Sequence, residues 1–256
     1  MKILSVAMVG LVSVGMLFGF QGTGKLDVGV AYRSAHAAGD RAAMAELWKE
    51  HPDRILGTFD ADLEGGLAVW EQGEEGHGAK TAELFARALW GAQVASEATG
   101  RRIFGDYAGS FVSWTDEQRR SFRAGQAAFG ASRKAQGAGD WEEALEQGRD
   151  CRVRAMALGD WWGAAMGYMG EGVSLHKLGR HEEAAAALGL ARLINQDLGL
   201  VGSELGAAVQ LAKCLVEMDA GPRAAAAVDA ALGLARRLGQ EEAEDELKRM
   251  QAELAK

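Results

Sequence analysis

Cysteine is scarce in this 256-residue chain, which holds only Cys151 and Cys214. The two form no C-x-x-C pair, and neither has a histidine at metal-ligand spacing. The sequence therefore excludes a disulfide-rich scaffold and offers no zinc-finger pattern. We expect both cysteines to be small buried residues of helices. The alternative is a disulfide between them, which an oxidising compartment would permit.

Proline and positive charge are also in short supply. The chain has two prolines against 35 glycines, a combination that suits closely packed helices separated by tight turns. Its net charge is −8, its isoelectric point is about 5.3, and no run of lysine and arginine offsets this acidity. Non-specific nucleic-acid binding needs clustered cations that face phosphates, so we expect no nucleic-acid partner.

Motifs of known catalytic chemistry are missing. The chain has no G-x-S-x-G nucleophile turn, no G-x-x-x-x-G-K-[ST] phosphate loop and no H-E-x-x-H zinc motif. His176 and His181 straddle a predicted turn, which makes them a poor metal pair. The acidic pairs at 142–143 and 182–183 start predicted helices, where negative charge suits the helix dipole. We therefore expect no catalytic residue, no cofactor, no metal site and no small-molecule substrate.

The N-terminal stretch 3–20 (ILSVAMVGLVSVGMLFGF) carries no charged side chain and follows Lys2. As a helix it would be about 27 Å long, just enough for a bilayer core of about 30 Å. One interpretation of residues 1–24 is a signal anchor, a single transmembrane helix with its N-terminus in the cytoplasm. The other is a cleaved signal peptide, although the cleavage site around 22–24 would be poor. Both predict an exported body that is membrane-anchored, periplasmic or secreted.

A 40-residue repeat is the clearest pattern in the sequence. The dipeptide Leu-Gly recurs at 158–159, 198–199 and 238–239, and the segments before each copy align without gaps. A glycine after the last leucine of a helix can take the left-handed conformation that closes the helix. Each repeat is therefore predicted to be helix, turn, helix, and the fold class to be all-α.

These repeats resemble the tetratricopeptide repeat (TPR), in the 40-residue variety found in kinesin light chain and related adaptors. The resemblance covers residues 121–240, and the segment Leu178–Ala184 (LGRHEEA) closely matches the family's turn. Only Tyr168 keeps a large aromatic anchor. The resemblance implies a TPR-like solenoid with three repeats over 115–240. Small residues occupy the nine positions where the family's helices touch, namely Ser132, Ala144, Cys151, Gly172, Ala184, Ala191, Ala212, Ala224 and Ala231.

The remaining body is also predicted to be helical. Residues 25–114 have less regular patterns, with a polar break at 71–78, and are expected to form an irregular helical region or degenerate repeats. Residues 241–256 are predicted to form an amphipathic capping helix for the end of the solenoid. Trp161 and Trp162 fall in the first turn of a repeat, where we expect them to wedge neighbouring units together rather than stack on a ligand.

The resemblance also implies a binding groove, because the first helices of successive TPR units line a concave face. Here that face would combine flexible apolar side chains with several cations, which suits an extended or helical peptide of acidic character. About half of the apolar side chains are expected to pack against neighbouring helices instead. The predicted peptide-binding residues are Gln126, Phe129, Arg133, Met166, Met169, Val173, His176, Lys177, Val209, Lys213 and Val216.

The main functional hypothesis is a non-enzymatic scaffold at a membrane or in the bacterial cell envelope that binds a protein or peptide partner. An alternative is a permanent structural subunit of a membrane protein complex, which binds through its convex face or its apolar N-terminal segment. A third hypothesis is an enzyme with an unrecognised site in residues 25–114. The lack of a recognisable set of acid, base and nucleophile argues against it.

Overall fold

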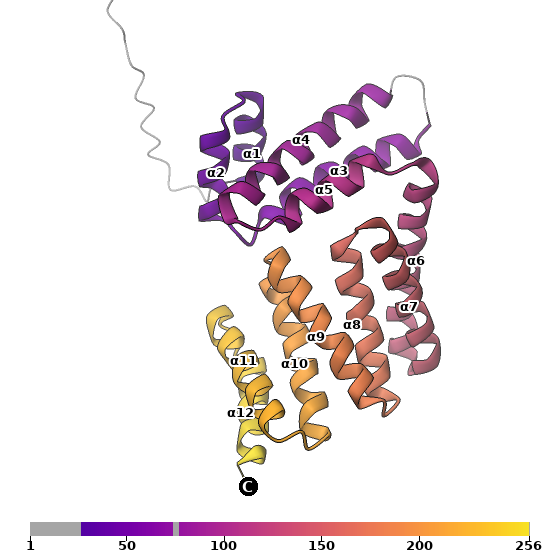
Figure 1. Cartoon of the computed structure of the whole chain (residues 1–256), viewed down its shortest axis with the longest axis vertical. Coiled ribbons are helices and arrows are strands. Elements are labelled where there is room, and N and C mark those ends of the chain that lie inside the picture. Colours follow the sequence, from indigo (N-terminus) through magenta and orange to yellow (C-terminus); the bar gives the residue numbers. More distant parts are fainter. Residues whose placement is uncertain (1–26, 74–76, 256) are drawn as a thin grey trace, which may run out of the picture.

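The computed structural model describes residues 27–73 and 77–255, which form twelve α-helices and no strand (Figure 1). The predicted all-α class is therefore confirmed. The anchor or signal segment at 3–20 lies outside the described residues. Within the described part, no helix is long and apolar enough to cross a membrane. The helices are α1 (Val28–Ala37), α2 (Arg41–Glu50), α3 (Ile55–Glu71), α4 (His77–Thr99), α5 (Ile103–Ser113), α6 (Asp116–Ala138), α7 (Trp141–Leu158), α8 (Trp161–Lys177), α9 (His181–Leu198), α10 (Val201–Glu217), α11 (Pro222–Leu238) and α12 (Glu241–Leu254).

Helices α6 to α11 follow the predicted 40-residue spacing. The helices α7, α9 and α11 end at Leu158, Leu198 and Leu238, and the glycine after each is left-handed, with φ of 68°, 72° and 63°. The N–H of each glycine bonds back to carbonyl groups of the last turn, as a left-handed C-cap requires. At the starts of α7 and α8, Asp140 and Asp160 accept N–H groups of the first turn. These local signals explain why the helix ends could be predicted.

The nine positions predicted to be small are all buried. Helices α7 and α8 approach each other especially closely. A Cβ atom added to Gly167 of α8 would lie 2.6 Å from the backbone N of Arg152, and one added to Gly148 of α7 would lie 3.0 Å from the backbone N of Glu171. The buried carboxylate of Glu171 accepts hydrogen bonds from Arg149 and Arg152 at 3.1 and 2.7 Å. Close backbones and paired charges therefore fix the α7–α8 contact.

Helices α1 to α5 form a layer that lies across one end of the α6–α12 array (Figure 1). The region predicted to be irregular but helical is helical, and α3 and α4 are separated at the polar break expected at 71–78. The core of the layer is aromatic, with Phe59, Phe104, Tyr107 and Phe111 almost fully buried. Because neighbouring rings lie 6.1–6.2 Å apart in tilted and edge-to-face arrangements, they stabilise the layer beyond their buried area.

The two tryptophans at the start of α8 join the array to this layer. Trp161 and Trp162 are partly buried against the aromatic cluster of the layer, which also includes Leu158 and Leu198 from the ends of α7 and α9. The indole N–H of Trp114 donates to the carbonyl of Leu158 at 2.9 Å. The expectation of a wedge between repeats thus needs correction. The first turn of α8 lies at the end of the array that the layer covers, so these side chains join the layer as well as the repeats.

Replacing Trp114 by Phe should lower the free energy of unfolding by about 2 kcal/mol, because a buried carbonyl loses its donor and the core loses volume. Chemical denaturation followed by circular dichroism measures this change. Trp141→Phe serves as the matched control, since Trp141 is only half-buried at the start of α7. Equal effects of the two substitutions would show that the Trp114–Leu158 bond does not hold the layer to the array.

The C-terminal helix α12 packs on the helices before it, and the two cysteines are buried as predicted from the sequence. Leu247 of α12 is fully buried in a cluster with residues of α10 and α11, so this helix covers the end of the array. Cys151 and Cys214 are both buried free thiols. The alternative of a disulfide between them therefore has no support in the fold.

Candidate functional site

The predicted groove residues lie on α6, α8 and α10, and α8 contacts both of the other helices. Gln126, Arg133 and Lys177 are exposed. His176 and Val209 are buried, because they pack between helices rather than face outward. A ligand along these helices would therefore not reach His176 or Val209. The partly exposed residues are Phe129, Met166, Met169, Val173, Lys213 and Val216.

Several of these partly exposed side chains have partners within the chain. Met169, Val173 and Val216 pack against a buried cluster of α8, α9 and α10 residues. The Lys213 ammonium lies 2.8 Å from the carboxylate of Glu246 in α12. Among the cations of the predicted groove, Arg133 and Lys177 are the exposed ones in the part of the chain that the structure describes.

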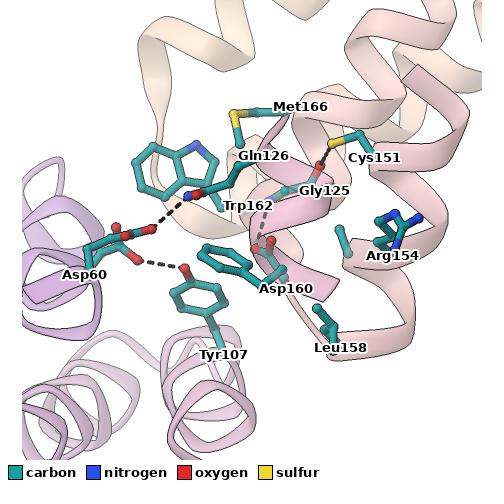
Figure 2. A pocket seen from close by; sticks show the side chains of 14 residues that line it. Asp60, Tyr107, Gly125, Gln126, Cys151, Arg154, Leu158, Asp160, Trp162 and Met166 are labelled. Atoms are coloured by element: carbon teal, nitrogen blue, oxygen red, sulfur yellow. Dashed lines mark hydrogen bonds between the residues drawn. The ribbon is translucent and has the colours of Figure 1, made fainter. Parts of the chain in front are cut away.

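A cavity of about 300 Å³ opens near the start of α8, where the array meets the α1–α5 layer (Figure 2). Two predicted groove residues, Gln126 and Met166, line it. Its walls are mainly apolar, and its volume lies at the lower end of the range of about 300–1,000 Å³ for ligand pockets. The lining residues are Asp60, Glu64, Tyr107, Phe122, Gly125, Gln126, Cys151, Arg154, Ala155, Leu158, Asp160, Trp162, Gly163 and Met166.

Two buried carboxyl groups give the cavity an acidic corner (Figure 2). Burial raises the pKa of Asp60 to about 6, although the Tyr107 hydroxyl, which donates to it at 2.6 Å, acts in the opposite direction. Burial also raises the pKa of Asp160 to about 7, against the effect of the Gly163 N–H, which donates to its Oδ1 at 2.8 Å. Both groups therefore change protonation near neutral pH.

A hydrogen-bond network at the cavity ties α6 to α3. The Arg123 guanidinium donates to Glu64 at 2.7 Å and to Glu71 at 2.6 Å, and the Gln126 amide donates to Glu64 at 2.8 Å. Gln126 was predicted to face a ligand, yet its amide already has partners within the chain. A ligand that uses Gln126 must compete with this network.

The thiol and the guanidinium in the cavity wall are both held in unreactive states. Burial, followed by the charges of Asp160 and Asp150, raises the pKa of the Cys151 thiol to about 12, so at neutral pH it is not a thiolate nucleophile. The Arg154 guanidinium is held by Asp150 at 2.8 Å. An apolar group that carries a cation or a hydrogen-bond donor would match the aromatic walls and the acidic corner.

The sequence did not reveal that residues from both parts of the chain build this cavity. Asp60 and Tyr107 belong to the region that showed no clear family pattern, and Trp162 was interpreted as a packing residue. One signal was present in the sequence, because Asp60 and Asp62 lie in a predominantly apolar helical segment, and the structure shows that both are buried. Buried carboxylates within an apolar helix need partners, and such partners point to a contact with another segment.

No family model matches the chain, and a comparison with curated proteins gives no match.

Proposed function

We propose that the chain is a non-enzymatic, TPR-like interaction module that binds a protein or peptide segment along α6, α8 and α10. The observation that carries the proposal is the cavity beside Gln126 and Met166, because it offers a pocket in line with the predicted groove. Residues 3–20 would hold the module at a membrane or direct it to the cell envelope. The 40-residue spacing and the buried small residues support the TPR-like solenoid.

The proposed ligand has one anchor side chain and an acidic flank. Apolar walls and two carboxyl groups favour an anchor that is apolar and basic, such as lysine or arginine with a long aliphatic stem. At 1.5 Å per residue, Arg133 lies about 10 Å further along α6 than Gln126, and Lys177 about 16 Å further along α8 than Met166. These cations would pair with acidic residues of the same peptide.

Selection of peptides from a random library on the full chain tests this proposal. The selected peptides should share an apolar or basic anchor with acidic residues on one side. Met166→Arg should weaken their binding at least 10-fold, because the new side chain fills the cavity and its guanidinium pairs with the carboxyl groups there. Arg133→Glu combined with Lys177→Glu should weaken binding similarly, and calorimetry measures both losses.

The control for these charge changes is Arg237→Glu, which makes the same change at an exposed residue of α11. Lys213 is a poorer test position, because its replacement also breaks the ion pair with Glu246. Binding that survives both groove variants, or that the Arg237 control weakens equally, would rule out the proposed groove.

A second candidate function, a permanent subunit of a membrane complex, also has an observation in its favour. Val153 and Met156 of α7 and Leu190 and Leu193 of α9 are large apolar side chains that are 43–55% exposed. They lie on the second helices of two repeats, away from the predicted groove. Purification of the full chain in mild detergent separates the two functions. A stable complex of fixed stoichiometry supports the subunit, and transient capture supports the peptide-binding module.

A further inference from the structure

Three side chains with metal-binding atoms meet where α8, α9 and α10 come together. His176 lies near the end of α8, His181 is the first residue of α9, and Cys214 lies near the end of α10. One donor atom from each lies within 4.8 Å of the others. The cluster shares no residue with the cavity near Trp162, so it is independent of the proposed peptide site.

One ring nitrogen of the cluster lacks a hydrogen-bond partner among the described residues. This atom is Nδ1 of His181, which is buried. Buried polar atoms are normally satisfied, so this nitrogen calls for an explanation. Cys214 is fully buried and His176 is 7% exposed, whereas His181 is only half-buried. An ion could therefore reach the cluster from the side of His181.

The donor set matches the preferences of zinc. Two imidazoles and one thiolate are borderline to soft ligands, and zinc sites with three protein ligands leave a fourth position for water or another group. Bonds of about 2.0–2.3 Å would bring tetrahedral donor atoms to about 3.3–3.8 Å from each other. Because the donor atoms lie within 4.8 Å of one another, metal binding requires them to approach by at most about 1.0–1.5 Å.

A carboxylate beside the cluster completes this arrangement. Nε2 of His176 lies 2.8 Å from Oε2 of Glu217. Metal-binding histidines commonly pair with a carboxylate, which fixes the ring and increases its basicity. At present the Cys214 thiol donates to the backbone carbonyl of His181 at 3.2 Å. On metal binding the thiol proton would leave to solvent and the sulfur would bond to the ion.

We propose that His176, His181 and Cys214 bind one Zn²⁺ ion, which clips the second and third helix pairs of the array together. The spacing of the two histidines alone gave no metal pattern, because the third ligand lies 33 residues beyond His181. The fold brings the third ligand, Cys214, next to the two histidines. Because α8, α9 and α10 each contribute one ligand, the ion would hold three successive helices.

Titration of the full chain with Zn²⁺ alone, after treatment with a chelator, tests the site. We expect one ion per chain, with a dissociation constant below about 1 µM, and a midpoint of thermal unfolding that rises with Zn²⁺. Substitution of Co²⁺ should give a thiolate-to-metal absorption band. Cys214→Ser should abolish this band although Cys151 remains, which would identify the sulfur ligand.

His181→Ala is the decisive variant, because its half-buried position at a helix start allows the protein to fold without the imidazole. It should weaken Zn²⁺ binding at least 100-fold and remove the zinc-dependent rise in the unfolding midpoint. His51→Ala, a half-buried histidine outside the cluster, should change neither. Absence of stoichiometric binding in the wild-type chain, or unchanged binding in His181→Ala, would overturn the proposal.

Discussion

Gly167→Ala should lower the free energy of unfolding by about 3 kcal/mol, a large share of the stability of an ordinary domain. The added Cβ atom would lie 2.6 Å from the backbone N and 2.7 Å from the Cα of Arg152. Backbone atoms within a helix cannot rotate away as a flexible side chain can. Helices α7 and α8 must therefore move apart, and the partly buried hydrogen bond from Arg152 to Glu171 weakens as a result.

Denaturant unfolding of the full chain measures this loss, and Gly233→Ala is its matched control. Gly233 is an exposed residue of α11, and an added Cβ there meets nothing within 4 Å. Since alanine is the better helix former, the control should gain about 0.5–1 kcal/mol. If both glycines respond alike, helix propensity rather than the close α7–α8 approach governs stability at position 167.

Relative to the wild type, Asp160→Asn should have a free energy of unfolding that is about 2–4 kcal/mol higher at pH 8 than at pH 4. Burial raises the pKa of Asp160 to about 7, whereas an aspartate in the unfolded chain titrates near 3.9. Between these two values the folded state binds more protons than the unfolded state. The stabilisation that the Asp160 carboxyl group contributes is therefore full below about pH 4 and is lost as the pH rises through 7. About three pKa units correspond to about 4 kcal/mol.

Asparagine is the informative replacement because it stays neutral and can still accept the N–H of Gly163 as a helix cap. Compared with the wild type, Asp160→Asn should gain stability progressively from pH 4 to pH 8. Asp140→Asn makes the same change at the N-cap of the preceding helix, α7, where the side chain is exposed to solvent. Parallel stability curves for the wild type and Asp160→Asn would show that burial does not control this carboxyl group.

The features that could be predicted from the sequence are those encoded by local patterns. Leu158 followed by glycine ends a helix through backbone conformation alone, so the helix boundaries followed from the repeat. Small residues such as Ala184 mark close helix contacts for a similar reason, because any larger side chain would push the backbones apart. The all-α class and the buried small positions were predictable on these grounds.

The cavity and the metal-binding cluster could not be predicted in the same way. Asp60 and Asp160 lie 100 residues apart in the chain, and only the packing of the α1–α5 layer on the array brings them to one cavity. Trp162 was expected to wedge neighbouring repeats together, but it packs against the α1–α5 layer, which has no repeat pattern that would have identified it as the partner. Contacts of this kind depend on side-chain shape across distant segments, which a single sequence does not display.

The cavity has walls from both parts of the chain, and this links ligand binding to the docking of those parts. Tyr107 belongs to the layer, and Met166 belongs to the array. A ligand that touches both walls binds only chains in which the two parts are docked, so each bound molecule shifts the population toward the docked form. The reciprocal effect follows by thermodynamic necessity. Docking strengthens ligand binding by the same factor by which the ligand strengthens docking, so mutations that separate the two parts, even far from the cavity, will weaken binding.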